Sequence, residues 1–206
     1  IPFCTIYSTF LQRAYDQIIH DVALQNLPVI FGIDRGGLVG EDGPTHHGVF
    51  DLSYLRLIPN MIIAAPMNEV QLRNLMYTAQ LDPKGPFAIR YPKGEVSSSD
   101  WEKEFEEMTI GKGRIVSKGK DIAVLSIGAT GLDTIEAVES LKSDGIDITH
   151  VDMIFLKPID EKLLHDVCKQ HKAIITVEDG TIQGGLGSAV AEFILQNDYI
   201  LPLTRL

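Results

Sequence analysis

The sequence contains little cysteine. Its 206 residues include only two cysteines, Cys4 and Cys168, which lie far apart and show no CxxC spacing. This pattern fits reduced thiols in the cytoplasm better than it fits the disulfide framework of a secreted domain. We therefore expect a cytoplasmic protein in which both cysteines are core residues.

The sequence also lacks long apolar runs and an excess of positive charge. No run approaches the roughly 20 apolar residues that a membrane span requires, and no basic segment precedes an apolar one at the start. A net charge of -10 predicts repulsion from nucleic acid and from anionic lipid. We therefore expect neither nucleic acid nor a membrane as a partner. The net charge does not exclude a local basic pocket for a phosphate.

What is present is the composition of an ordinary globular protein, with 45% apolar and 22% charged residues. Both ends read as interrupted apolar runs, because the chain begins with "IPFCTIYS" and stops at "YILPLTRL" with no turn signal beyond it. The sequence therefore predicts a fragment of a larger protein.

The first half alternates short apolar runs with amphipathic stretches. Strands are expected at 2–7, 28–33, 61–66 and 86–92, and helices at 9–25 and 68–80. Strands that alternate with helices indicate a parallel, doubly wound sheet that is covered on both faces.

A polar and acidic segment, "KGEVSSSDWEKEFEEM", interrupts this alternation. We interpret 95–108 as a linker between domains at 1–94 and 109–206, the alternative being a surface loop with one short helix. Beyond it, strands are expected at 121–128, 148–156 and 173–179, with helices at 132–143, at 161–170 and after "GGLGS". The predicted fold class is two doubly wound, mostly parallel α/β domains in series.

Ligands of such sheets bind at loops that leave the carboxyl ends of strands. The strand "PVIFGI" runs into "DRGG" and then into "LVGEDGPTHHG", where Asp42 and His46 stand four residues apart among several glycines. A histidine can move protons at neutral pH and a carboxylate can accept a hydrogen bond, so these two residues are candidate catalytic groups. Arg35 can offer two parallel hydrogen bonds to a phosphate or carboxylate, unless it pairs with Asp34 or Glu41 as part of the scaffold.

The sequence offers two other candidate sites. A metal site would use Asp42, His46 and His47, but adjacent histidines converge poorly on one ion and no further ligand has a recognisable spacing. We therefore expect no metal in this chain. The amides of "GGLGS" at 184–188 could hold an anion, yet a tight turn with close helix packing is the simpler interpretation.

Larger blocks of the sequence resemble a known family. "YSTFLQRAYDQIIHDVALQNLPV", "DRGGLVGEDGPTHHGVFDLSYLRLIPNM" and "GPFAIRYPKG" resemble the pyrimidine-binding domain of the 1-deoxy-D-xylulose-5-phosphate synthases, transketolase-like enzymes that use thiamine diphosphate. "VDMIFLKPIDE" and "VEDGTIQGGLGSAV" resemble the C-terminal domain of the same family. The resemblance covers essentially the whole chain and implies a pyrimidine-binding domain without its first segment, followed by a C-terminal domain without its end.

The resemblance implies a transferase that condenses pyruvate with D-glyceraldehyde 3-phosphate, forming 1-deoxy-D-xylulose 5-phosphate and carbon dioxide. This reaction opens the non-mevalonate route of isoprene biosynthesis and feeds thiamine biosynthesis. The family binds Mg²⁺ and the cofactor's diphosphate in an earlier domain, so "EDG" at 41–43 is not that site, and the family's catalytic glutamate is expected before Ile1. We therefore expect the fragment alone to be inactive and its parent to be a homodimer.

Individual residues match the family's functional positions. By this resemblance, Phe10 stacks on the aminopyrimidine ring of the cofactor, with Arg13 nearby on the same helix. Tyr7, Asp42 and His46 match positions that face the substrate, where they would hold its hydroxyls and assist proton transfer.

The same resemblance assigns Arg35 and Lys93 to the substrate phosphate. Lys93 stands where the family usually has arginine, so the charge is kept but the two-pronged hydrogen bonding is lost. His47 receives no role. The rival interpretations are the β-subunit of a 2-oxoacid dehydrogenase, a true transketolase, or a non-catalytic α/β binding module, since fold alone does not fix function.

Overall fold

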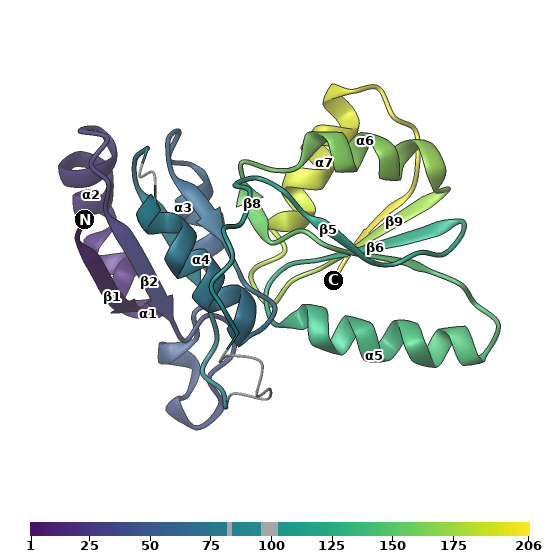
Figure 1. Ribbon diagram of the computed structural model, residues 1–206, viewed down its shortest axis with the longest axis horizontal. Helices are drawn as coiled ribbons and strands as arrows, with labels where there is room; N and C mark the ends of the chain where they lie inside the picture. The colour runs from purple at the N-terminus through teal and green to yellow at the C-terminus, as the bar shows by residue number, and fades with distance from the viewer. Residues whose placement is uncertain (82–83, 96–102) are drawn as a thin grey trace.

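The computed structural model, shown in Figure 1, describes residues 1–81, 84–95 and 103–206. It contains two five-stranded sheets. In spatial order the first consists of β1 (Phe3–Tyr7), β2 (Ile30–Asp34), β4 (Phe87–Arg90), β3 (Ile62–Ala64) and β8 (Phe155–Lys157). The second consists of β10 (Leu203–Arg205), β9 (Ala173–Val177), β6 (Ile122–Ser126), β7 (Thr149–Asp152) and β5 (Arg114–Ser117).

Within each sheet the strands run parallel except at one edge. The edge strand β8 is antiparallel to β3, and the edge strand β5 is antiparallel to β7. The expected pair of mostly parallel α/β sheets is thereby confirmed.

Helices cover both faces of the first sheet. Neighbouring residues of a strand point to opposite faces, and Ile30 and Phe31 of β2 accordingly enter two different cores. The core that holds Phe31 also contains residues of the helical segment 8–23 and of α3 (Asp51–Arg56). The core that holds Ile30 contains residues of α4 (Glu69–Leu81). The sequence pattern did not predict α3, which is only six residues long.

The helix expected at 9–25 is present but irregular. It is built from α1 (Ser8–Leu11), the 3₁₀ turn η1 (Gln12–Ala14), α2 (Tyr15–Gln17) and the π-helical η2 (Ile18–Ala23). The apolar spacing of four residues therefore predicted the buried face correctly, but it did not reveal the changes in helical pitch.

The second sheet is covered in the same way. Val124 of β6 packs with α5 (Thr130–Ser143), while its neighbours Ala123 and Leu125 pack with α6 (Glu161–Gln170) and α7 (Leu186–Gln196). Figure 1 shows α5 on one side of this sheet and α6 and α7 on the other. None of the helices in the described ranges combines the length and the apolar content needed to cross a bilayer.

The prediction of a single strand at 148–156 was wrong, because the chain turns within this segment and forms two strands. Ile154 has a φ of 56°, and its amide is held by the Asp152 carboxylate at 3.3 Å. This turn leaves β7 in the second sheet and sends β8 across to the first. Residues 148–156 are all buried, so no polar break marks the turn and sequence analysis does not reveal it.

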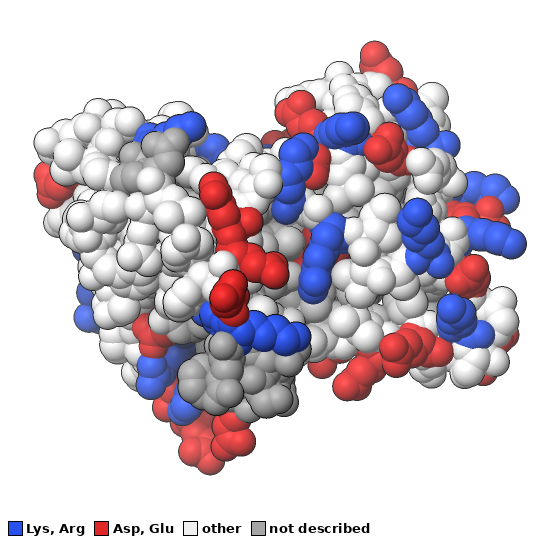
Figure 2. Space-filling model, viewed as in Figure 1, with Lys and Arg blue, Asp and Glu red and all other residues white. Residues whose placement is uncertain are grey.

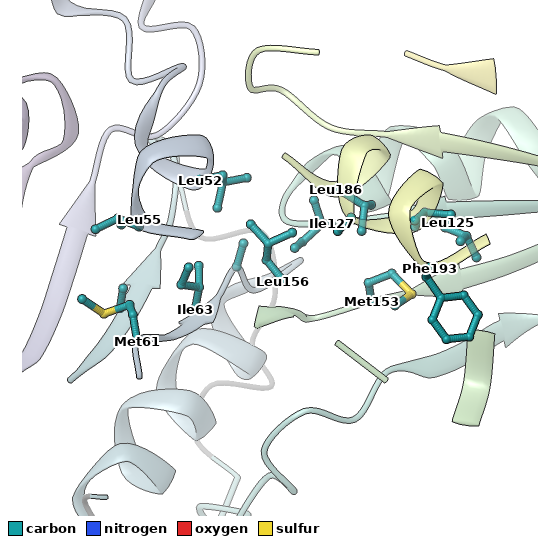
Figure 3. Close-up of a cluster of buried hydrophobic side chains, with 14 of the residues drawn as sticks. Leu52, Leu55, Met61, Ile63, Leu125, Ile127, Met153, Leu156, Leu186 and Phe193 are labelled. Atoms are coloured by element: carbon teal, nitrogen blue, oxygen red, sulfur yellow. The ribbon is translucent and has the colours of Figure 1, made fainter. Parts of the chain in front are cut away.

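The two sheets consequently share one core. Figure 3 shows Leu52 and Ile63 of the first sheet layer meeting Leu156, with Ile127 and Leu186 continuing the cluster into the second. Such a core joins the two halves into one packed unit, although each half has its own sheet.

The segment proposed as a linker, 95–108, lies partly outside the described residues. Its described end packs along α4, because the amide of Glu106 donates to the Asn74 side chain at 3.2 Å and the amide of Met108 donates to Thr78 Oγ1 at 2.8 Å. The domain boundaries themselves stay a prediction. On the face shown in Figure 2, acidic and basic side chains are interspersed, and most of the basic ones lie over the second half.

Candidate functional site

Three parallel strands of the first sheet end side by side. The register places Tyr7 opposite Asp34, at the ends of β1 and β2, and Ile33 opposite Arg90, at the end of β4. Residues that follow these strands are therefore brought to one edge of the sheet, which is where a doubly wound fold binds its ligands.

An aromatic cluster forms at this edge. The ring centroids of Tyr7 and Phe10 lie 4.8 Å apart, and the imidazole of His46 lies 5.8 Å from the first and 5.7 Å from the second. Phe10 is the first-turn residue that follows β1, and 43% of its surface is exposed. An aromatic ring that is packed by two other rings yet open to solvent suits the stacking of a planar ligand.

Polar groups secure this cluster to its loop. The hydroxyl of Thr9 donates to the carbonyl of Thr45 at 3.1 Å, and Thr45 Oγ1 lies 3.0 Å from Nδ1 of His46. The first turn after β1 thus holds the segment that presents His46.

Asp42 completes the cluster with a negative charge. The Tyr7 hydroxyl donates to Oδ2 of Asp42 at 3.1 Å, and Nζ of Lys93 lies 3.6 Å from the same oxygen. The hydrogen bond from Tyr7 lowers the pKa of Asp42, and Lys93, Arg35 and His46 lower it further. Loss of solvent and the hydrogen bond to Asp42 both raise the pKa of Tyr7. At neutral pH the pair therefore consists of a carboxylate and a protonated phenol.

Arg35 lies beside the cluster in a left-handed conformation, with a φ of 57°. Its guanidinium carbon sits 4.7 Å from the centre of the Tyr7 ring, and the side chain also pairs with Asp34. Arg35 therefore forms the ion pair with Asp34 that was expected of a scaffold residue. This pair leaves part of the guanidinium unused, because Nε of Arg35 is buried without a hydrogen-bond partner among the described residues. A planar cation with a free N–H is suited to an anionic ligand.

The loop that carries these groups is closed at its base. The amide of Gly37 donates to the carbonyl of Gly48 at 2.7 Å, and the amide of Gly48 donates to the carbonyl of Gly37 at 2.8 Å. Two 3₁₀ turns, η3 (Gly40–Asp42) and η4 (Pro44–His46), lie between these ends. We call 36–48 the site loop.

His47 has a structural role that sequence analysis did not assign. Its Nδ1 accepts a hydrogen bond of 3.2 Å from the amide of Val39, on the opposite side of the site loop. An accepting Nδ1 carries no proton, so this histidine ties two parts of the loop together while its neighbour His46 faces the aromatic cluster.

A buried ion network lies directly behind the cluster. Arg90 is only 1% exposed; its Nε donates to Asp51 at 3.2 Å, its Nη2 donates to the Gly48 carbonyl at 3.1 Å, and it also pairs with Asp179. Burial tends to lower the pKa of Arg90, but the two carboxylates outweigh it and raise the pKa. Sequence analysis missed this network, although a charged residue inside the apolar strand "PFAIR" was a signal for it.

Most of the residues assigned by resemblance come together here. The structure places at this one edge Tyr7, Phe10, Arg35, Asp42, His46 and Lys93. Arg13 is exposed, and no hydrogen bond, ion pair or ring contact joins it to the others within the part of the chain that the structure describes. The described residues also include no group of three or more His, Cys, Asp or Glu that could hold a metal ion.

The amides of "GGLGS" are already occupied. The amides of Leu186 and Gly187 each donate to the Glu178 carboxylate at 2.9 Å. Burial raises the pKa of Glu178, and these two amides oppose that shift. A side chain of the protein itself thus fills the anion position, and the tight-turn interpretation fits.

Comparison with known proteins gives two family matches. Residues 1–98 match the family described as transketolase, pyrimidine binding domain, and residues 111–205 match the transketolase C-terminal domain. A solved structure of a split gene transketolase, an inactive beta4 tetramer, superposes with a TM-score of 0.86 at 31% identity, covering 100% of this chain and 66% of that one.

The chain also resembles curated relatives over its full length. It is 59% identical over 207 residues to a 1-deoxy-D-xylulose-5-phosphate synthase of Cytophaga hutchinsonii and 58% identical over 206 residues to one of Bacteroides thetaiotaomicron. Both matches include 100% of this chain and 32% of the relative, so the chain spans about a third of the length of these proteins. The chain therefore belongs to the transketolase family and, within it, to the 1-deoxy-D-xylulose-5-phosphate synthases, of which it carries the pyrimidine-binding and C-terminal domains.

Proposed function

We propose that this chain forms the substrate-facing part of a thiamine diphosphate-dependent transferase that condenses pyruvate with D-glyceraldehyde 3-phosphate, forming 1-deoxy-D-xylulose 5-phosphate and carbon dioxide. The observation that carries the proposal is the convergence of Tyr7, Asp42 and His46 beside the half-exposed ring of Phe10. The identity to synthases over the whole chain supports it.

The residues present fit the cofactor. Phe10 offers an open aromatic face, and Tyr7 and His46 fix its position from two sides, so Phe10 would hold the aminopyrimidine ring by stacking. Arg13, one turn further along the same helical segment, would lie at the outer edge of that ring. When bound, the cofactor supplies an electron sink for the bond that breaks in pyruvate.

The protein's own groups then bind the substrate and move protons. Asp42, kept ionised by its lowered pKa, accepts hydrogen bonds from substrate hydroxyls, and the phenol oxygen of Tyr7, whose proton is donated to Asp42, can accept one. The imidazole of His46, 5.8 Å from the Tyr7 ring, is the side chain placed to transfer protons. Arg35 and Lys93 supply the positive charge for the substrate phosphate, and Lys93 stays near the edge through its ion pair with Asp42.

The remaining parts of the proposal concern the parent protein. Mg²⁺ and the cofactor's diphosphate, together with the glutamate that activates the aminopyrimidine, would be supplied by other regions, so the isolated chain is expected to be inactive. We infer a cytoplasmic homodimer that serves isoprene and thiamine biosynthesis. Cys168 is buried as expected, whereas Cys4 is exposed, so the expectation that both are core residues was wrong for Cys4; both are free thiols, which fits a reducing compartment.

Product analysis tests this function. The full-length protein that carries this chain is given Mg²⁺ and thiamine diphosphate with three substrate pairs in parallel: pyruvate with D-glyceraldehyde 3-phosphate, a ketose phosphate with an aldose-phosphate acceptor, and pyruvate with oxidised lipoamide. We expect pyruvate with D-glyceraldehyde 3-phosphate to yield 1-deoxy-D-xylulose 5-phosphate and carbon dioxide in equal amounts. Reductive acetylation of lipoamide, in which its disulfide accepts the electron pair as the acetyl group is transferred, would indicate the dehydrogenase subunit; ketol transfer would indicate a transketolase, and no turnover with any of them would favour the non-catalytic module.

A further inference from the structure

A carboxylate of the C-terminal half reaches the base of the site loop. Asp179 follows β9 in the second sheet, and its side chain pairs with Arg90, which ends β4 in the first sheet. Two residues further on, the amide of Thr181 donates to the carbonyl of Val49 at 2.9 Å. The segment 179–181 therefore touches the first half where the site loop ends.

Arg90 and Asp179 pack against both ends of that loop without room for a side chain. A Cβ added at Gly36 would lie 2.2 Å from Arg90 Nε, and one added at Gly37 would lie 2.2 Å from Asp179 Oδ2. At the other end, Arg90 Nη2 donates to the Gly48 carbonyl at 3.1 Å. The two charged groups thus form the floor on which the loop closes.

The guanidinium of Arg90 is held between two carboxylates, one from each half of the chain. Asp51 is fixed from the first half, because it accepts from Ser8 Oγ at 2.7 Å and from the Leu52 amide at 2.8 Å. Asp179 comes from the second half and holds the Nη1 side of the guanidinium. With both present the plane of the guanidinium is fixed, and with Asp51 alone it can turn about that contact and leave Gly48.

We propose that Asp179 is a positioning residue: it holds Arg90 against the base of the site loop, so that the C-terminal domain fixes the loop that presents Asp42 and His46. The inference rests on the proposed function where it concerns turnover, but its structural part concerns only the loop. A rival explanation is that Asp179 merely stabilises the contact between the two halves.

The matched control is another ion pair between the halves. Arg56 of α3 pairs with Glu192 of α7, and neither residue touches the site loop. Glu192→Gln therefore weakens a carboxylate–arginine contact between the halves while leaving the floor of the loop intact. Asp179→Asn keeps the size of the side chain and one acceptor oxygen, which separates loss of charge from loss of folding.

The experiment uses the full-length protein and two measurements. Amide hydrogen exchange of peptides covering 36–48 is measured without substrate, and kcat and KM are then measured with pyruvate and D-glyceraldehyde 3-phosphate. We expect Asp179→Ala to speed exchange of the loop amides at least about tenfold, because their closing hydrogen bonds open more often. We expect kcat to fall by about tenfold to a hundredfold with a smaller change in KM, since misplaced catalytic groups act on the chemical step. Asp179→Asn should fall between Asp179→Ala and the unsubstituted protein, and Glu192→Gln should change neither quantity.

Unchanged exchange of the loop in a folded Asp179→Ala or Asp179→Asn protein overturns the inference. Equal effects of Glu192→Gln overturn it as well, because they would assign the role to general contact between the halves. The two proposals fail separately: an unsubstituted protein without synthase activity contradicts the proposed function, while the exchange measurement still decides whether Asp179 holds the loop.

Discussion

The hydroxyl of Tyr7 donates a hydrogen bond of 3.1 Å to the carboxylate of Asp42. This hydrogen bond connects the end of β1 to a 3₁₀ turn in the site loop. It is stronger when Asp42 is charged, so it is the main cause of the lowered pKa of Asp42, and it adds to the effect of desolvation in raising the pKa of Tyr7. This contact is the simplest place to test the electrostatics of the site.

Replacing Tyr7 with phenylalanine should raise the pKa of Asp42, since the hydrogen bond from Tyr7 is the largest cause of its lowered value. A carbon-detected NMR titration of the Asp42 carboxyl measures this directly. Tyr91→Phe is the control, because the Tyr91 hydroxyl makes no contact with Asp42 among the described residues. An Asp42 midpoint that stays in place or moves down in Tyr7→Phe contradicts the assignment.

Replacing Arg90 with glutamine should destabilise the fold strongly. The change leaves the buried carboxylate of Asp51 without its cation, and removing one partner of a buried ion pair typically costs about 3–5 kcal/mol. Urea unfolding measures the loss. Arg56→Gln breaks a more exposed pair and should cost no more than about 1 kcal/mol. Equal losses in the two variants would show that the Arg90 network contributes little.

His150 should make the protein less stable in acid. Burial, with a smaller contribution from Arg114, lowers the pKa of His150 from 6.5 to about 4. Between these values the unfolded chain binds a proton that the folded chain does not, so stability is lost as the pH falls through this window. The full shift corresponds to about 3 kcal/mol.

The variant His150→Gln lacks this titration and keeps a polar group opposite Ser126, the residue that His150 contacts at 2.8 Å. Its free energy of unfolding, relative to that of the unsubstituted protein, should therefore rise by about 3 kcal/mol between pH 7 and pH 4. Urea unfolding at several pH values provides the comparison. A difference that does not change with pH would mean that His150 titrates normally.

Lys93→Arg should strengthen binding of the phosphorylated substrate in the full-length protein. A guanidinium can form two parallel hydrogen bonds to a phosphate, whereas an ammonium acts as a point charge. We expect KM for D-glyceraldehyde 3-phosphate to fall about threefold to tenfold, a gain of about 1 kcal/mol, with KM for pyruvate unchanged. Steady-state kinetics with each substrate varied in turn would reveal the opposite pattern if Lys93 lay near pyruvate instead.

The fold was predictable where local pattern decides it. The strands that carry Tyr7 and Asp34 and the buried face of the first helical segment follow from apolar periodicity alone. The crossing of β8 could not be predicted, because the turn at Ile154 interrupts no apolar pattern. Its partner β3 lies about ninety residues earlier in the chain, and pairing over such a separation leaves no local signal.

The site divides in the same way. Asp42 and His46 lie in the site loop and Arg35 directly precedes it, and the composition of this segment made all three candidates before the structure. The pairing of Arg90 with Asp179 joins residues from two sheets, and each residue alone resembles an ordinary charged side chain. The resemblance already separated His46 from His47, but the physical difference between them required the structure, because only the folded loop brings the Val39 amide to His47.

That difference offers the most direct test of the account. In the full-length protein, His46→Ala should lower kcat for the condensation of pyruvate with D-glyceraldehyde 3-phosphate by about a hundredfold or more, as expected for loss of a general acid–base group, without loss of stability. His47→Ala should cost about 1 kcal/mol of stability, through the lost hydrogen bond to Val39, and change kcat only a few fold. A large loss of turnover in His47→Ala with an active His46→Ala protein would contradict the proposed site.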